Sequence, residues 1–168
     1  MKPVIKRILE SFFLLNFFML FLISCGSSRD TAGKGDMNDL QNLVANRDFE
    51  VQNDWAVPLS GSNVNLIGNP NYIRFKGDSV KIALPYFGER YSGGYNTEGG
   101  IRYEGPARNF QVSEKANSMI LEFEGQQGSE NYNFIMTLFP NGKTTTSVNS
   151  SQRSTISYRG EITASKSE

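Results

Sequence analysis

The pattern of apolar and polar residues changes twice along the chain. Residues 8–23 are almost continuously apolar, residues 26–36 are small and polar, and beyond residue 46 apolar side chains recur at every second position. A continuous apolar run is typical of a membrane-inserted or targeting segment, whereas alternation predicts strands with one buried face. The pattern therefore predicts three parts: a leader over 1–24, a tether over 25–36 and a folded domain over 37–168.

The folded part begins with a helical pattern. Asp36 can cap a helix over residues 37–46, with Leu40, Leu43 and Val44 on its apolar face. The rest alternates, and Asn141-Gly142 is a strong hairpin signal because both residues tolerate positive φ. We expect an all-β fold, an antiparallel meander of about eight or nine strands forming a barrel or a strongly curved sandwich. The alternating segments are 49–52, 73–76, 80–84, 101–104, 110–112, 119–124, 132–138 and 156–162.

The leader has the features of a secretory signal peptide. Lys2, Lys6 and Arg7 precede the apolar run, which is shorter than the roughly 20 residues a spanning helix needs. Its end, Leu22-Ile23-Ser24-Cys25, resembles the lipobox of bacterial lipoproteins. That resemblance implies cleavage between Ser24 and Cys25 and a diacylglycerol on the Cys25 thiol. An ordinary signal peptide or an uncleaved anchor is the alternative.

Lipidation at Cys25 would fix the compartment. Each buried CH₂ contributes about 0.8 kcal/mol, so two or three acyl chains hold a protein to a bilayer essentially permanently. The following polar segment, residues 26–36, is predicted to be a flexible tether. Gly26 and Ser27 carry no obvious inner-membrane retention signal. We therefore expect an envelope protein, anchored in the outer membrane and facing the periplasm.

Composition excludes several chemistries. The 168 residues contain no histidine, and Cys25 is the one cysteine, which excludes Ser-His-Asp and Cys-His catalysis, His-based zinc sites and disulfides. The formal net charge is zero, so nucleic acid is a poor candidate partner. We expect no metal and no cofactor.

Two stretches, 55–71 and 85–100, do not alternate, and long loops are often functional. The second is rich in glycine and tyrosine, and tyrosines on a permissive loop suit ligand contact. Alternatively, the rings plug the end of the barrel, and Arg153 holds a turn by pairing with an acid or a backbone carbonyl. The candidate ligand or partner surface comprises Tyr86, Phe87, Glu89, Arg90, Tyr91, Tyr95 and Arg153.

Three functional hypotheses follow. The first is a non-enzymatic, membrane-tethered domain that binds either an envelope protein at loop 85–100 or a small apolar ligand inside the barrel. The second is a carboxylate-dependent hydrolase of envelope glycans, using Glu89 and Glu98. The third is a structural envelope subunit with a large exposed apolar patch.

Several motifs together resemble a known family. They are residues 62–70, 84–88, 99–101 with 105–106, 138–142 and 148–158. Over most of residues 38–163 the chain is similar to a lipoprotein family of the Bacteroidota, catalogued as domain of unknown function 4251. The resemblance implies a secreted, lipid-anchored β domain and no assigned activity. It also implies candidate O-glycosylation at Asp-Ser/Thr-aliphatic tripeptides, at Thr31 and Ser79, although such short patterns also arise by chance.

Overall fold

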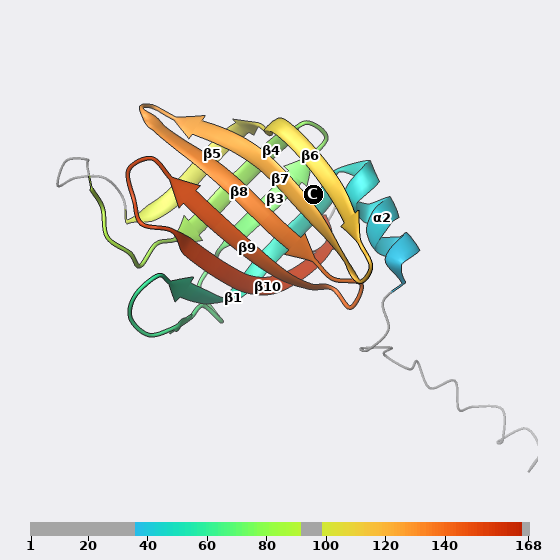
Figure 1. The fold of residues 1–168 in the computed structure, drawn as a ribbon, viewed down its shortest axis with the longest axis horizontal. Helices are drawn as coiled ribbons and strands as arrows, with labels where there is room; N and C mark the ends of the chain where they lie inside the picture. The colour runs from blue at the N-terminus through green and yellow to red at the C-terminus, as the bar shows by residue number, and fades with distance from the viewer. Residues whose placement is uncertain (1–35, 92–98, 166–168) are drawn as a thin grey trace, which may run out of the picture. The chain divides into compact units, whose positions relative to one another are not determined.

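The computed structural model describes residues 36–91 and 99–165, and its first element is the predicted helix. Helix α2 spans Met37–Asn46, as the sequence pattern predicts (Figure 1). The Asp36 side chain accepts a hydrogen bond from the backbone N–H of Asn38 at 3.0 Å, which satisfies one of the free donors of the first turn. Leu40 and Val44 are buried against the sheet.

The remainder is a single antiparallel sheet. Its strand order is β5-β4-β3-β1-β10-β9-β8-β7-β6, with the short β2 paired to β1. Consecutive strands pair from β3 to β5 and from β6 to β10, and the terminal strands β1 and β10 pair with each other, so the predicted meander is confirmed. The strands are β1 (Asp48–Pro58), β2 (Val64–Asn65), β3 (Tyr72–Lys76), β4 (Ser79–Pro85), β5 (Gly100–Pro106), β6 (Arg108–Lys115), β7 (Ser118–Gln127), β8 (Glu130–Leu138), β9 (Lys143–Ser150) and β10 (Ile156–Ala164).

The sheet curls into a nearly closed barrel because its two edges belong to one bent run of chain. Eight successive antiparallel pairings lead from β5 round to β6, so these two strands point the same way, and only Ala107 separates them. The first half of the run pairs with β4 and the second half with β7. The bend coincides with Asn109, whose φ is 52°, and with a register shift between Arg108 and Gln111.

Aromatic rings fill the centre of the barrel. Phe75 lies 4.7 Å from Phe49 and 5.1 Å from Phe123, centroid to centroid, and Phe123 stacks on Phe134 at 4.7 Å. These rings come from β3, β1, β7 and β8, strands on different sides of the barrel, so they meet across its interior. Eight-stranded barrels are just wide enough for side chains to fill in this way.

One stretch predicted to be a loop is partly sheet. β1 continues through Trp55 to Pro58, and β2 returns beside it. The alternation is hidden by a bulge, because the register with β10 shifts between Asn53 and Trp55. Asn53 and Ala56 are both buried although three positions apart, so the period of two is broken at this point.

The barrel has two different ends. Helix α2 lies at one end, near the start of β1 (Figure 1). Strand directions place the last residues of β1 and β4 and the first residues of β5, β8 and β10 at the opposite end. We call this opposite end the mouth. It is formed by residues 58–71, 85–91, 99–100, 127–130 and 150–155.

Candidate functional site

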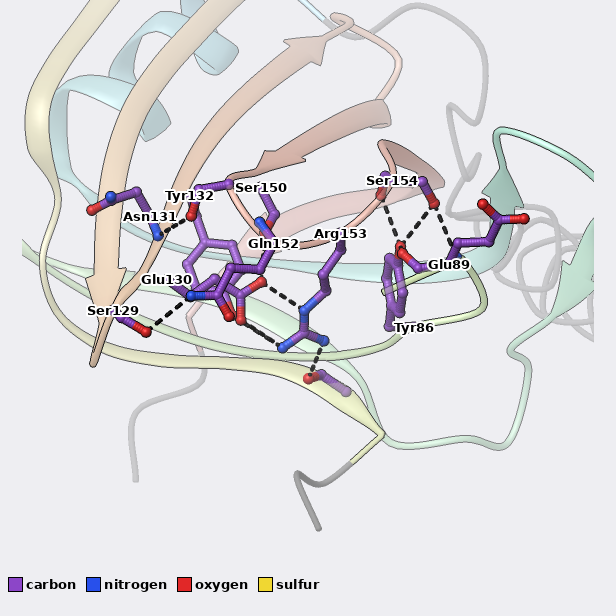
Figure 2. Close-up of polar contacts among 12 residues, drawn as sticks. Tyr86, Glu89, Ser129, Glu130, Asn131, Tyr132, Ser150, Gln152, Arg153 and Ser154 are labelled. Carbon is purple, nitrogen blue, oxygen red and sulfur yellow. Dashed lines mark hydrogen bonds and ion pairs between the residues drawn. The ribbon is translucent and has the colours of Figure 1, made fainter. Parts of the chain in front are cut away.

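The mouth is organised around a buried ion pair. Arg153 lies in the turn between β9 and β10, and Glu130 is the first residue of β8. The guanidinium donates from Nε to Glu130 Oε1 at 2.7 Å and from Nη2 to Oε2 at 2.9 Å, which is a bidentate pair (Figure 2). Its Nη1 donates to the carbonyl oxygen of Gly100 at 2.8 Å, so one side chain ties the starts of β5, β8 and β10 together.

The pair stays charged although it is buried. Burial by itself would raise the pKa of Glu130, but hydrogen bonds from Arg153 and from the Ser150 and Tyr132 hydroxyls bring that pKa below its ordinary value. Burial would likewise lower the pKa of Arg153, and the hydrogen bond to Glu130 raises it. Burial and the neighbouring Glu130 raise the pKa of Tyr132 to about 12. Near neutral pH, a neutral phenol therefore adjoins a carboxylate and a guanidinium.

A strap of residues 85–91 crosses the mouth beside this pair. The Tyr86 hydroxyl lies 2.9 Å from the carbonyl oxygen of Ser154 and 2.8 Å from that of Glu89 (Figure 2). Backbone bonds add to these contacts, since Ser154 N donates to Glu89 O at 2.9 Å and Tyr91 N donates to Gln152 O at 2.8 Å. The strap is thus fixed to the turn that carries Arg153.

Two further close contacts fix the strap, one from Tyr158 below it and one within it at Gly88. The Tyr158 hydroxyl, deep in the barrel, donates to the carbonyl oxygen of Pro85 at 2.8 Å. Gly88 leaves room for the Tyr86 ring, because a Cβ at position 88 would lie 2.4 Å from the Tyr86 hydroxyl oxygen. The glycine is required here by the close approach of Tyr86.

A hollow of about 310 Å³, most of whose lining residues are polar, opens next to this network. Its centre is a row of outward side chains across three strands, because Glu124 pairs with Asn133 and Asn133 pairs with Asn149. Within the described residues, the side-chain amides of Asn131 and Asn133 make no hydrogen bond. The lining residues are Arg108, Glu124, Gly125, Asn131, Tyr132, Asn133, Asn149, Ser150 and Ser151.

The ion pair supports the wall of the hollow. Ser150 donates to Glu130, and Tyr132 lies 3.3 Å from the guanidinium of Arg153 (Figure 2). Asn131 and Ser151 are joined twice, since each backbone N–H donates to the other residue, to Ser151 Oγ and to Asn131 O, at 3.0 Å. The strands that present the amides are therefore fixed from the inside.

Comparison with known proteins places the fold. A sequence model of the family described as Domain of unknown function (DUF4251) matches residues 33–162. The chain belongs to the DUF4251 family. A crystal structure of a DUF4251 family protein from Bacteroides eggerthii DSM 20697 has a similar fold, with a TM-score of 0.60 and 15% sequence identity, over 76% of this chain and 86% of that chain. At this identity the likeness concerns the fold alone, and no curated protein matches the sequence.

In this DUF4251 chain the predicted surface divides into two groups. Tyr86 and Arg153 make contacts within the protein, as the alternative interpretation predicts. Tyr86 covers the mouth, and Arg153 pairs with the acid Glu130. Phe87, Glu89 and Tyr91 are exposed, and Arg90 is half-buried and bridges to the backbone of Arg153.

Other predicted residues lie outside the described part of the chain. These are Ser24, Cys25, Thr31, Tyr95 and Glu98. Ser79 is described and exposed at the start of β4. Among the described residues no helix is long and apolar enough to cross a membrane, and no group of three or more acidic, cysteine or histidine side chains is arranged to hold a metal ion.

Sequence reasoning missed Glu130 and the asparagine row. Glu130 shares the inward phase of Tyr132 and Phe134, and a charge in the apolar phase of a strand is a signal for a buried pair. The row across β7, β8 and β9 gives no such signal, because it depends on strand register.

Proposed function

We propose that this protein is a lipid-anchored, non-enzymatic domain of the cell envelope that binds a glycan in this hollow. The observation that carries the proposal is the row of Glu124, Asn133 and Asn149 on the outer face, beside the buried Arg153–Glu130 pair. A side-chain row on strands is a more rigid platform than a loop, and rigidity lowers the entropic cost of binding.

The chemistry of the hollow fits a saccharide unit. The side-chain amides of Asn131 and Asn133 offer donors and an acceptor in one plane, which match the neighbouring hydroxyls of a sugar, and the Ser151 hydroxyl adds a donor. Arg108 and Glu124 balance in charge, which favours a neutral ligand over an anion. The volume of about 310 Å³ is at the lower end of the range for small-ligand sites, which suits one or two sugar rings.

Binding suits the hollow better than hydrolysis. Glycosidases use two carboxyl groups about 5–9.5 Å apart, one on each side of the scissile bond. Glu124 is the single carboxylate among the residues that line the hollow, and it accepts a hydrogen bond from Asn109 at 2.8 Å. Glu130 lies behind the wall and is neutralised by Arg153.

The interior of the barrel supports the same choice. The Phe49, Phe75 and Phe123 rings occupy the space that a small apolar ligand would need. The proposal therefore assigns binding to the outer surface.

Binding is tested by titrating the mature chain, carrying Cys25→Ser, with the neutral disaccharide chitobiose and, as an anionic comparison, with lipopolysaccharide core oligosaccharide, followed by amide NMR shifts. We expect shifts at residues lining the hollow, and at least about tenfold weaker binding by Asn133→Ala, since a lost hydrogen bond costs about 1–3 kcal/mol. Asn42→Ala is the matched control, because Asn42 is exposed on α2 at the other end of the barrel. Equal weakening by both substitutions, or shifts confined to other faces, would contradict the proposal.

Anchoring rests on the lipobox at Leu22 to Cys25 and on the polar segment after it. Mass spectrometry of the mature protein should show a diacylglycerol thioether on Cys25. Cys25→Ser should move the protein from the membrane fraction to the soluble fraction, because the acyl chains provide the holding force. An unmodified Cys25 thiol in the membrane-bound protein would refute the anchor.

A further inference from the structure

Large apolar side chains are exposed mainly at the mouth. Of the seven such side chains among residues 36–91 and 99–165, five lie on segments at or next to this end. The other two, Val112 and Phe139, lie elsewhere on the barrel. We call the five the apolar rim: Trp55 (40% exposed), Leu59 (75%), Ile67 (73%), Phe87 (41%) and Tyr91 (67%).

Strand register and hydrogen bonds connect the backbone segments that carry the apolar rim. Pro58, next to Leu59, pairs with Ile156 at the start of β10. The residues just before β10 are bonded to the strap, because Gln152 accepts a hydrogen bond from Tyr91 N at 2.8 Å. The rim therefore follows the edge of the mouth from β1 across the start of β10 to the strap.

The backbone on both sides of the mouth that carries the rim is held in place by the fold. Trp55 pairs with Asn65 across β1 and β2, and Asn65 Oδ1 accepts a hydrogen bond from Ile67 N at 2.8 Å. Phe87 follows Tyr86, whose hydroxyl is bonded to the Ser154 turn (Figure 2). Exposed apolar groups gathered at one end of a protein mark a surface for a protein or membrane partner.

We infer that the apolar rim inserts into the headgroup boundary of a lipid bilayer, so that the mouth of the barrel lies against the membrane. Tryptophan and tyrosine prefer this boundary because their rings are apolar with a polar edge, and leucine, isoleucine and phenylalanine add apolar area. None of the rim residues lines the hollow, and each is at least 40% exposed, so the rim faces away from the protein.

The length of the chain before α2 allows this orientation. The inference rests on the proposed anchor at Cys25 for the presence of a nearby bilayer. Residues 26–35 can span at most about 33–36 Å. β1 has 11 residues and, with the usual barrel tilt, rises about 25–30 Å. A chain anchored beyond α2 can therefore turn its mouth to the same bilayer.

The experiment uses the fluorescence of Trp55, the one tryptophan in the chain. The mature chain carrying Cys25→Ser is mixed with vesicles of phosphatidylethanolamine and phosphatidylglycerol, with and without brominated acyl chains. We expect a blue shift of the Trp55 emission on binding and quenching by the brominated lipid. The double variant Leu59→Asp/Ile67→Asp should bind the vesicles at least about tenfold more weakly, because two exposed apolar anchors are lost.

The control and the outcomes separate this inference from the anchor. Val112→Asp changes an exposed apolar residue away from the mouth, so it should bind vesicles like the parent. Equal binding by the Leu59→Asp/Ile67→Asp variant, or an unshifted Trp55 emission, would overturn the inference, as would capture of a protein through the rim without vesicle binding. Because the probe carries no acyl chain, a failure of lipidation at Cys25 leaves this measurement unchanged.

Discussion

At the scale of single residues, the mouth depends on Arg153 and Glu130. Arginine and glutamate usually lie on protein surfaces, yet here the Arg153 and Glu130 side chains are only 5% and 10% exposed. Removing one partner of a buried pair leaves an uncompensated charge, which costs far more than the pair itself contributes. Breaking the pair is therefore expected to lower the free energy of unfolding by more than the intact pair adds to it.

We predict that Arg153→Met and Glu130→Gln each lower the free energy of unfolding by about 3–5 kcal/mol. The double substitution should cost less than the sum of the two, because it leaves no lone buried charge. Urea unfolding of the four proteins measures the coupling. Additive losses would show that the two side chains act independently, contrary to the bidentate geometry.

The same pair predicts a dependence of stability on pH. The pKa of Glu130 is lower in the folded protein than its ordinary value of 4.5, so folding favours the ionised carboxylate. This contribution is complete above that ordinary value and is lost as the pH falls through the lower, folded pKa. Thermal melts between neutral pH and pH 3 should show the loss, and Glu130→Gln should have a flatter profile over this window.

At the scale of elements, the closest approach is between β1 and β10. A Cβ at Gly160 would lie 2.0 Å from the carbonyl oxygen of Gln52 and 2.6 Å from Asn53 Cα. These are backbone atoms and cannot rotate away. The glycine sits beside the bulge that shifts the register of β1, so bulge and glycine together allow the two terminal strands to pair.

We predict that Gly160→Ala lowers the free energy of unfolding by about 3 kcal/mol or more, since the β1–β10 pairing must open to admit a methyl group. Gly99→Ala is the matched control. Among the described residues other than its chain neighbours, no heavy atom lies within 4 Å of a Cβ at Gly99, and its backbone carries no positive-φ strain, so its effect should stay within about 0.5 kcal/mol. Similar urea midpoints for the two variants would contradict this account.

At the scale of the whole molecule, the barrel is closed by two non-local features. β10 pairs with both β1 and β9, and the bent run from β5 to β6 connects β4 to β7. The Tyr103 ring on β5 packs beneath Gly125 of β7, where a Cβ would meet its ring carbons at 3.0 Å. Pairing between distant chain segments forms late in folding and makes the sheet a single cooperative unit.

We predict that ending the chain at Thr155, which removes β10, abolishes folding of the entire domain. The loss would expose the edges of β1 and β9 and open the core. Dispersed amide resonances and a cooperative thermal transition should both disappear, whereas a chain ending at Ser165 should keep them. A truncated chain that still melted cooperatively would show that the remaining strands form a separate unit.

The sequence by itself determined the features that local chemistry controls. Local sequence alone produces the period of two, the Asn141-Gly142 turn and the Asp36 cap. The predictions made from such patterns are confirmed, namely the helix, the all-β fold and the DUF4251 resemblance. The lipobox around Cys25 is also local, and lipidation stays a prediction.

Only the tertiary structure decided which side chains meet. Arg153 and Glu130 are 23 positions apart, and the row of Glu124, Asn133 and Asn149 depends on the register of three strands. A shift of one residue in register would turn every one of these side chains to the other face of the sheet. Register is set by packing of the whole core, so the hollow, the strap and the apolar rim became visible only in the folded barrel.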